Sequence, residues 1–416
     1  MSEVPFPAVT ICDPDVVYGP STENITKILS SRGYNSSQIS DFYLSFTAIN
    51  DIGYSPPMYL KKMHGMLEGL NLPLNALLNL LKKPCDVMLV SCTWRSKVHN
   101  CSTMFREVFI LSSYCCQFDM THFQRNAQSN TNFISGMSPN EALEVVVNGR
   151  KYLPNGTTEE GHLLVYVLDE QDTITFLDHS LTITPATLFD INVDVWMIDS
   201  SEYVKALNVK SRGCILKTDP TYGTGFYHGC MAATVMKHVS EICRCIPYNF
   251  KWSDLNVDIR KQCSWERLAC IYETTDRVLG NMKGIIAESD CYQRCDYVQY
   301  DTDAKYIRQQ RRFHDLSNGY SKISVHFNDD ICLKYRREVL YTWDQVLANL
   351  GGIFGLCLGG SVISLIELVW FIFDILINTI NNYFRGKGDA RSIVYQNSMM
   401  ISTIDKYNVG KLKFSN

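Results

Sequence analysis

Two carboxylates inside an apolar stretch are the residues whose placement most strongly indicates chemistry. Residues 351–377, GGIFGLCLGGSVISLIELVWFIFDILI, are nearly all apolar, yet they include Glu367 and Asp374. In one continuous helix, Gly360, Glu367 and Asp374 lie within about 40° of one another, with Ser364 beside Glu367. A carboxylate that faces lipid is costly, so acids in such a segment usually face water or a bundle interior. The pattern predicts a small, acidic helix face that lines a path for cations.

The length of the stretch is sufficient to cross a membrane. At about 1.5 Å per residue the helix runs roughly 40 Å, which exceeds the roughly 30 Å hydrocarbon core. The alternatives are a buried core helix and an acid that snorkels from a helix end, which suits Asp374 better than Glu367. Basic residues at 385, 387 and 391 favour a cytoplasmic C-terminal side, whereas those at 334, 336 and 337 weaken that assignment.

Cysteines and glycosylation sequons divide the chain into regions. Of the 416 residues 16 are cysteine, and all but one of these precede the apolar stretch. They are interleaved with four N-x-S/T sequons, at Asn24, Asn35, Asn100 and Asn155. Because disulfides and N-glycans belong to the extracellular compartment, we expect an extracellular cysteine-rich domain at 1–345. A membrane helix at 346–380 and a cytoplasmic tail at 381–416 are expected to follow.

Composition and missing motifs exclude two classes of function. The net charge of −4 provides no basic footprint for nucleic acid. No H-E-x-x-H, G-x-S-x-G or C-x-x-C motif occurs, and extracellular cysteines are mostly disulfide-bonded. We therefore expect neither an enzyme nor a metal site or cofactor.

The periodicity of apolar residues changes along the extracellular region. Leucines at helical spacing predict two short helices within residues 56–84, broken near Pro73. Alternation with a period of two predicts strands in LEVVVNGRKYL, HLLVYVLDE, TITFLDHSLTIT and KISVHF. GCMAATVMKHVSEIC has a helical pattern. The expected fold class is an α+β, disulfide-rich extracellular domain followed by a transmembrane helix.

The first residues conflict with an extracellular location. MSEVPFPAVTIC has neither the basic n-region nor the apolar h-region of a signal peptide, so nothing there would start translocation. Either the C-terminal span inserts after translation, which could hardly export so large an upstream region, or an N-terminal part of the natural protein is missing from this chain.

Signatures at both ends of the chain resemble those of a known family. FPAVTIC (6–12) and LGGIFGLCLGGSVISLIEL (350–368) closely resemble the two hallmark signatures of the epithelial sodium channel/degenerin family. Between them, SCTWRSKVHNC with SSYCCQF resembles the family's finger region, and CRCIP (243–247) resembles its thumb motif. LANLGGIFGLCLG is most similar to the insect pickpocket branch. The resemblance covers about residues 5–380.

The resemblance implies a trimer in which each subunit has cytoplasmic termini, two membrane helices and a large extracellular domain. In the family, the FPAVTIC signature lies soon after the first membrane helix, and here only five residues precede it. We therefore expect the first membrane helix to be absent from this chain, as in a truncated gene model or a fragment.

The resemblance also assigns roles within the apolar stretch. The family's selectivity tripeptide, small-x-Ser, falls on Gly359, Gly360 and Ser361. Backbone carbonyls and a serine hydroxyl can replace part of the hydration shell of a sodium ion. Ala348 matches the small-residue position at which bulky side chains hold degenerin pores open. Simple helix packing is the alternative reading of the tripeptide.

The resemblance implies a disulfide pattern, in which Cys85, Cys116 and Cys332 are left unassigned. The implied pairs are Cys12 with Cys115, Cys92 with Cys101, Cys214 with Cys295, Cys230 with Cys291, Cys243 with Cys270, and Cys245 with Cys263. Thr234 and Ser289 stand where the family has one further pair.

The function implied by the resemblance is that of a sodium-selective, amiloride-sensitive type of cation channel subunit in the plasma membrane. Sodium would move passively, with no cofactor. The expected partners are sodium ions, membrane lipid and related subunits in a homotrimer or heterotrimer. The alternative is a single-span cysteine-rich receptor or modulatory subunit that conducts nothing. The gating stimulus is not readable from the sequence, because relatives respond to acid, peptides, force or small chemicals.

Overall fold

The computed structural model describes residues 4–46, 57–72, 74–110, 113–127, 142–219, 227–247, 250, 259, 261–308, 319–329, 331–359 and 362–384. The chain divides into two compact units, Met1–Glu338 and Val339–Asn416.

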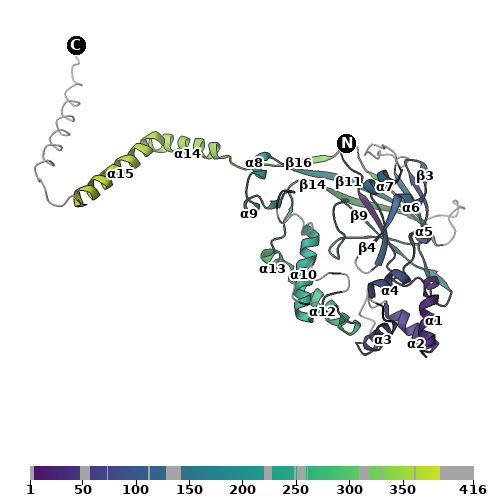
Figure 1. The fold of residues 1–416 in the computed structure, drawn as a ribbon. Helices are drawn as coiled ribbons and strands as arrows, with labels where there is room; N and C mark the ends of the chain where they lie inside the picture. Colours follow the sequence, from purple (N-terminus) through teal and green to yellow (C-terminus); the bar gives the residue numbers. More distant parts are fainter. Residues whose placement is uncertain are drawn as a thin grey trace, which may run out of the picture. The chain divides into compact units, whose positions relative to one another are not determined.

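Two β-sheets form the frame of the larger unit (Figure 1). The first has the strand order β10-β9-β1-β5-β4, and the second has the order β14-β11-β15-β6-β2-β3 with β16 beside β11. The strands of the first sheet are β1 (Ala8–Cys12), β4 (Phe105–Ile110), β5 (Ser113–Phe118), β9 (Leu163–Leu168) and β10 (Leu181–Ile183). Those of the second are β2 (Leu89–Trp94), β3 (Lys97–His99), β6 (Leu143–Asn148), β11 (Thr187–Ser200), β14 (Tyr297–Arg308), β15 (Tyr320–Phe327) and β16 (Leu333–Arg337). Two short pairs are β7 (Arg150–Tyr152) with β8 (Thr158–Glu160) and β12 (Cys214–Ile215) with β13 (Gln293–Arg294).

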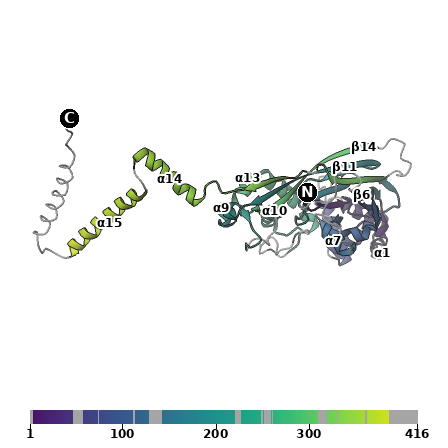
Figure 2. The ribbon, with the colours of Figure 1, turned by 90° about the horizontal axis from the view of Figure 1, so that it is seen from above.

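Helices gather beside the sheets in two groups, which Figures 1 and 2 show. The first group is α1 (Glu23–Ser31), α2 (Ser36–Leu44), α3 (Pro57–Leu70) and α4 (Leu74–Leu81). The second is α10 (Tyr227–Cys243), α12 (Leu268–Gly280) and α13 (Met282–Glu288). Short helices are α5 (Cys85–Met88), α6 (Cys101–Met104), α7 (Met120–Ala127), α8 (Glu202–Lys205) and α9 (Val209–Arg212), with 3-10 turns η1 (Gly19–Thr22) and η6 (Trp265–Arg267).

Most of the predicted elements are confirmed. Helices α3 and α4 occupy the 56–84 segment, on either side of Pro73, which lies outside the described residues. Strands β6, β9 and β15 and helix α10 also lie where the periodicity placed them. The strand expected over TITFLDHSLTIT is mostly wrong, because only β10 forms. Asp178 accepts hydrogen bonds from the backbone and the hydroxyl of Thr175, at 2.7 and 2.8 Å, and so stabilises a turn in place of a strand.

These elements form two large apolar cores among the described residues. Between the sheets, Phe6 packs edge-on against Trp94, Phe118 and Phe327, with ring centroids 4.9, 5.9 and 5.7 Å away. The two helical groups share the other core, in which Trp265 of η6 packs against Phe46, two residues after α2, with ring centroids 4.9 Å apart. The larger unit is therefore a two-sheet layer with a helical layer beside it.

Seven disulfides cross-link the larger unit. The six pairs that the resemblance implies are all present, and Cys85 with Cys116 is the seventh. In the described part of the chain, Cys332 and Cys357 are free thiols. Thr234 stands at one position of the family's missing pair. Its hydroxyl lies 3.7 Å from the sulfur of Cys291, which is bonded to Cys230.

The seventh disulfide follows from the geometry of β5. Consecutive side chains of a strand point to opposite faces, so adjacent cysteines cannot share a partner element. Cys115 is directly opposite Cys12 in the β1–β5 register and bonds to it. Cys116 therefore points the other way, where Cys85 of α5 meets it.

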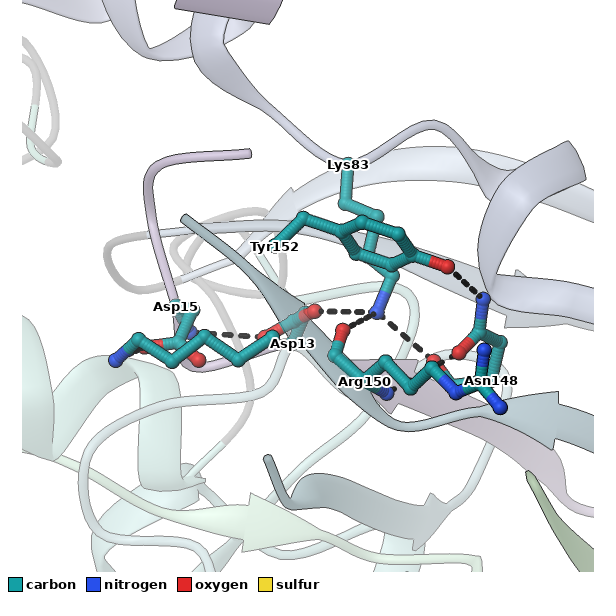
Figure 3. A network of polar contacts seen from close by, with 7 residues as sticks. Asp13, Asp15, Lys83, Asn148, Arg150 and Tyr152 are labelled. Carbon is teal, nitrogen blue, oxygen red and sulfur yellow. Dashed lines mark hydrogen bonds and ion pairs between the residues drawn. The ribbon is translucent and has the colours of Figure 1, made fainter. Parts of the chain in front are cut away.

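A buried ammonium group joins the layers of the larger unit (Figure 3). The Lys83 Nζ, beyond the end of α4, donates to the Asp13 carboxylate at 3.0 Å and to the carbonyls of Asn148 and Arg150 at 2.8 and 2.9 Å. Lys83 and Asp13 are 5% and 7% exposed. Burial raises the pKa of Asp13, and the charge of Lys83 opposes that rise. One side chain thus connects the helical layer with the ends of β1 and β6, which belong to different sheets.

We predict that Lys83→Met lowers the free energy of unfolding by about 3–5 kcal/mol, because it leaves a buried carboxylate without its partner. Lys151→Met is the matched control, since Lys151 and Asp15 form a pair 2.7 Å apart that is about 30% exposed. This substitution should lower the free energy of unfolding by at most about 1 kcal/mol. Urea unfolding followed by tryptophan fluorescence measures both. Equal costs for the two variants would show that the Lys83 network does not stabilise the fold.

A second prediction concerns the disulfide between Cys85 and Cys116. Replacing both with serine should lower the free energy of unfolding by about 3–4 kcal/mol, because the bond restricts a 31-residue separation in the unfolded chain. Cys332→Ser, which removes a free thiol, should change it little. The same unfolding assay compares them, and an unchanged stability of the double variant would contradict this assignment.

Candidate functional site

Two helices separated by a break make up the described part of the smaller unit. Helix α14 (Trp343–Leu358) begins with a capping box, in which the Thr342 amide donates to the Gln345 side chain at 3.1 Å. It ends at Gly359, whose φ is +63°. Helix α15 (Val362–Phe384) follows. The expectation of one unbroken helix from Gly351 to Ile377 is therefore wrong.

The break has a physical cause in the backbone of Gly359. A φ of +63° is left-handed, a conformation that glycine adopts freely and that side-chain-bearing residues adopt at a cost. A Cβ added at Gly359 would meet nothing within 4 Å. The glycine is thus required by conformation and not by crowding. Glycine just beyond the last helical residue is a common way for helices to end.

The break lies at the tripeptide that the sequence resemblance singled out. Gly359 ends α14, whereas Gly360 and Ser361 lie outside the described residues. The last four carbonyls of a helix lack intrahelical donors, and the C-terminal end of the helix dipole is negative. The end of α14 therefore offers oxygen atoms suited to a cation. Ala348, the expected gate position, is exposed on α14, three turns before this end.

The predicted acidic face persists only on α15. Glu367 and Asp374 are two turns apart on this helix and lie within about 20° of each other, with Ser364 about 60° from Glu367. Gly360, which the prediction placed on this face, lies outside the described residues. Trp370 and Phe371 also lie within about 60° of Glu367, so the face is small and polar only in part.

The surroundings of the two carboxylates differ. Asp374 accepts a hydrogen bond from Asn378 at 3.2 Å, one turn further along. Glu367 has no hydrogen-bond or ion-pair partner among the residues that the structure describes. A carboxylate within a membrane span requires water, a partner or a neighbouring helix, and none of the described residues is its partner.

The apolar face of α15 is suited to lipid. Within the described ranges, one helix is long and apolar enough to cross a membrane, Ile363–Ile380, and its residues are not buried by the rest of the chain. Leu365, Val369, Ile372 and Leu376 lie opposite Glu367 and are exposed. Length and composition thus fit a membrane span, although a single helix encloses no pore.

These features are those of a large disulfide-rich domain that is followed by one helix long and apolar enough to cross a membrane. Residues 1–371 match the sequence model described as amiloride-sensitive sodium channel, and the chain belongs to that family of ion channels.

Relatives of the chain include a sodium channel protein, a degenerin-like protein and a pickpocket protein. The sodium channel protein Nach of Drosophila ananassae is 22% identical, over 89% of this chain and 73% of the relative. The degenerin-like protein asic-1 of Caenorhabditis elegans is 24% identical, over 76% of this chain and 40% of the relative. Pickpocket protein 11 of Drosophila melanogaster is 23% identical, over 89% of this chain and 62% of the relative. The resemblance to the epithelial sodium channel/degenerin family, and to its pickpocket branch, is confirmed.

We predict that Gly359→Ala disfavours the break by about 1 kcal/mol, because alanine resists the left-handed conformation. The backbone amides that follow residue 359 should then exchange hydrogen more slowly in the chain reconstituted in lipid nanodiscs. Gly352→Ala is the control, since Gly352 lies within α14 and its added Cβ also meets nothing. Identical exchange after residue 359 in both variants would contradict a glycine-dependent break.

Proposed function

We propose that the chain is a subunit of a sodium-selective cation channel of the amiloride-sensitive type in the plasma membrane. The observation that carries this proposal is the helix end at Gly359, followed after two intervening residues by a helix whose Glu367 carboxylate has no partner among the described residues. Membership of an ion channel family and relatives named as sodium channels support it. Because a single span encloses no water, the proposal requires assembly with copies of this chain or related subunits, as a trimer.

The proposed mechanism divides the work between the break and α15. Carbonyl oxygens at the end of α14 and the hydroxyl of Ser361 replace part of the hydration shell of the ion. Glycine at 359 and 360 leaves room for close approach of the subunits. Glu367 raises the local concentration of cations on one side of this constriction. Ala348 lies where a larger side chain would obstruct closure. Sodium moves down its gradient, so no reaction or cofactor is involved.

The proposed orientation places the larger unit outside the cell. All four sequon asparagines are exposed in the structure: Asn24, Asn35, Asn100 and Asn155. Exposure is required for glycan attachment, and the seven disulfides suit an oxidising compartment. We infer that these four residues carry N-glycans.

The test separates conductance from selectivity. In cells that express the full-length protein, Glu367→Gln should lower single-channel conductance by roughly twofold and leave the preference for sodium largely intact, because it removes only a concentrating charge. Ser361→Val should reduce selectivity for sodium over potassium or abolish the current, since it removes a coordinating hydroxyl. Single-channel amplitudes and reversal potentials under sodium and potassium gradients measure the two quantities.

Asp374→Asn is the matched control for Glu367→Gln. Asp374 lies two turns farther from the break and already has a partner in Asn378, so its effect on conductance should be smaller. If Glu367→Gln left conductance and surface expression unchanged, the carboxylate would be a packing or assembly group. If the assembled full-length protein passed no current, the single-span receptor or modulatory subunit would be the better assignment.

A further inference from the structure

A cavity of about 260 Å³ lies in the larger unit, far along the chain from the membrane helices. Its walls are the loop between β9 and β10, the first turn of α10, and strands β13 and β14. The charged groups that line it are Asp169, Asp172, Asp178, His228 and Arg294. We call this cavity the Asp172 pocket.

The carboxylates of the Asp172 pocket outnumber its permanent cations. One nitrogen of Arg294 donates to both Asp169 and Asp172, at 2.9 and 3.1 Å, and its other terminal nitrogen donates to Gln171 at 3.0 Å. A single guanidinium therefore serves two carboxylates. His228 is 2.5 Å from Asp178, and this hydrogen bond raises the pKa of the histidine. Even with His228 protonated, the three carboxylates leave one negative charge without compensation.

Asp172 is the carboxylate that opens into the cavity. Its side chain is 32% exposed, whereas those of Asp169 and Asp178 are 10% and 4% exposed. Asp178 is held by Thr175 as well as by His228. Burial raises the pKa of Asp172 to about 6, while the charges of Arg294 and His228 act in the opposite direction and those of Asp169 and Asp178 reinforce the rise. The negative charge of Asp172 at neutral pH is thus poorly compensated, and an additional cation would be favoured there.

The remaining wall of the pocket is aromatic. Tyr227, Tyr297 and Tyr300 line it. The hydroxyls of Tyr297 and Tyr300 donate to Gln293 and to the carbonyl of Pro5, at 3.0 and 2.9 Å. With those hydroxyls engaged, the rings are the part left to contact a ligand, and tyrosine rings favour both aromatic and cationic groups.

We propose that the Asp172 pocket binds a small aromatic ammonium ion, with the ammonium group on the carboxylate of Asp172 and the ring against the tyrosines. An anion would meet the surplus of carboxylates. A metal ion is disfavoured, because no group of His, Cys, Asp or Glu in the described residues could hold one. The inference does not depend on ion conduction, so binding to the purified chain tests it separately from the proposed function.

Three probes of similar shape and different charge test the proposal. Tyramine carries an ammonium group, 4-ethylphenol is neutral, and 4-hydroxyphenylacetate is an anion. Calorimetry or ligand-observed NMR on the purified full chain at pH 7.5 should show tyramine binding at least about tenfold more tightly than either of the others. Equal binding of the three probes, or no tyramine binding at millimolar concentration, would overturn the proposal.

Asp172→Asn should weaken tyramine binding at least about tenfold, because the amide keeps the shape of the side chain and loses its charge. The matched control is Asp303→Asn, an exposed carboxylate on β14 that does not line the pocket, and it should bind tyramine as the wild type does. Unchanged binding by Asp172→Asn would contradict the assignment of the ammonium to this residue.

The pH dependence distinguishes a ligand contact from a structural role. Asp172 is ionised above pH 6 and neutral below it, whereas an alkyl ammonium stays charged throughout this range, as lysine does. Tyramine binding by the wild type should therefore weaken as the pH falls from 7.5 to 5. His228 also lines the pocket, has a raised pKa and gains positive charge in both proteins as the pH falls, so Asp172→Asn should keep only the smaller pH dependence that His228 causes. If Asp172→Asn does not fold, the charge preference and the pH profile of the wild type decide. A wild-type affinity that does not fall at pH 5 would refute the proposal.

Discussion

The contact on which the larger unit depends is the buried ammonium of Lys83. An ammonium group in an apolar interior is costly unless hydrogen-bond acceptors surround it, so the acceptors must converge on one point. Here they come from the end of β1, the end of β6 and the start of β7. This requirement fixes where the helical layer meets both sheets. The disulfide of Cys12, the residue next to Asp13, cross-links β1 to β5 at the same place.

In the apolar segment at the C-terminal side, as around Lys83, polar groups without partners are costly. Ending α14 at Gly359 leaves carbonyl oxygens without intrahelical donors, and Glu367 is a carboxylate within the span that has no partner among the described residues. At the surface of a soluble protein, water would satisfy both the free carbonyl oxygens and the carboxylate. In a membrane both need water, a cation or another subunit, and a water-filled cation path supplies all three. The break and the acid therefore support one function together, which neither would support alone.

Much of the fold could be predicted because its signals are local. Ile323, Val325 and Phe327 alternate with more polar neighbours, and β15 buries all three at 0–1% exposure. The strand expected before β10 was wrong because Asp178 hydrogen-bonds Thr175, a competition that apolar periodicity does not register. The break at Gly359 was missed because a long apolar run favours a continuous helix, although the Gly-Gly dipeptide signals a break.

Features that depend on distant segments could not be read from the sequence. The bond from Cys116 to Cys85 follows only once the register of β1 and β5 is known. Arg294 meets Asp172 across 122 positions, so nothing local marks the Asp172 pocket. The resemblance to the family predicted six disulfides correctly, because the cysteine pattern of the family already reflects such long-range contacts.

The central claim, that one face of α15 lines a water-filled cation path, is tested most directly by cysteine accessibility. In a conducting assembly, after Cys332 and Cys357 are replaced, single cysteines are introduced at Ser364, Glu367 and Asp374, and at the opposite positions Leu365, Val369 and Leu376. If this face lines the path, a positively charged thiosulfonate reagent reduces the current through the first three variants and leaves the others unchanged. Modification of the opposite face, or of neither face, would contradict it.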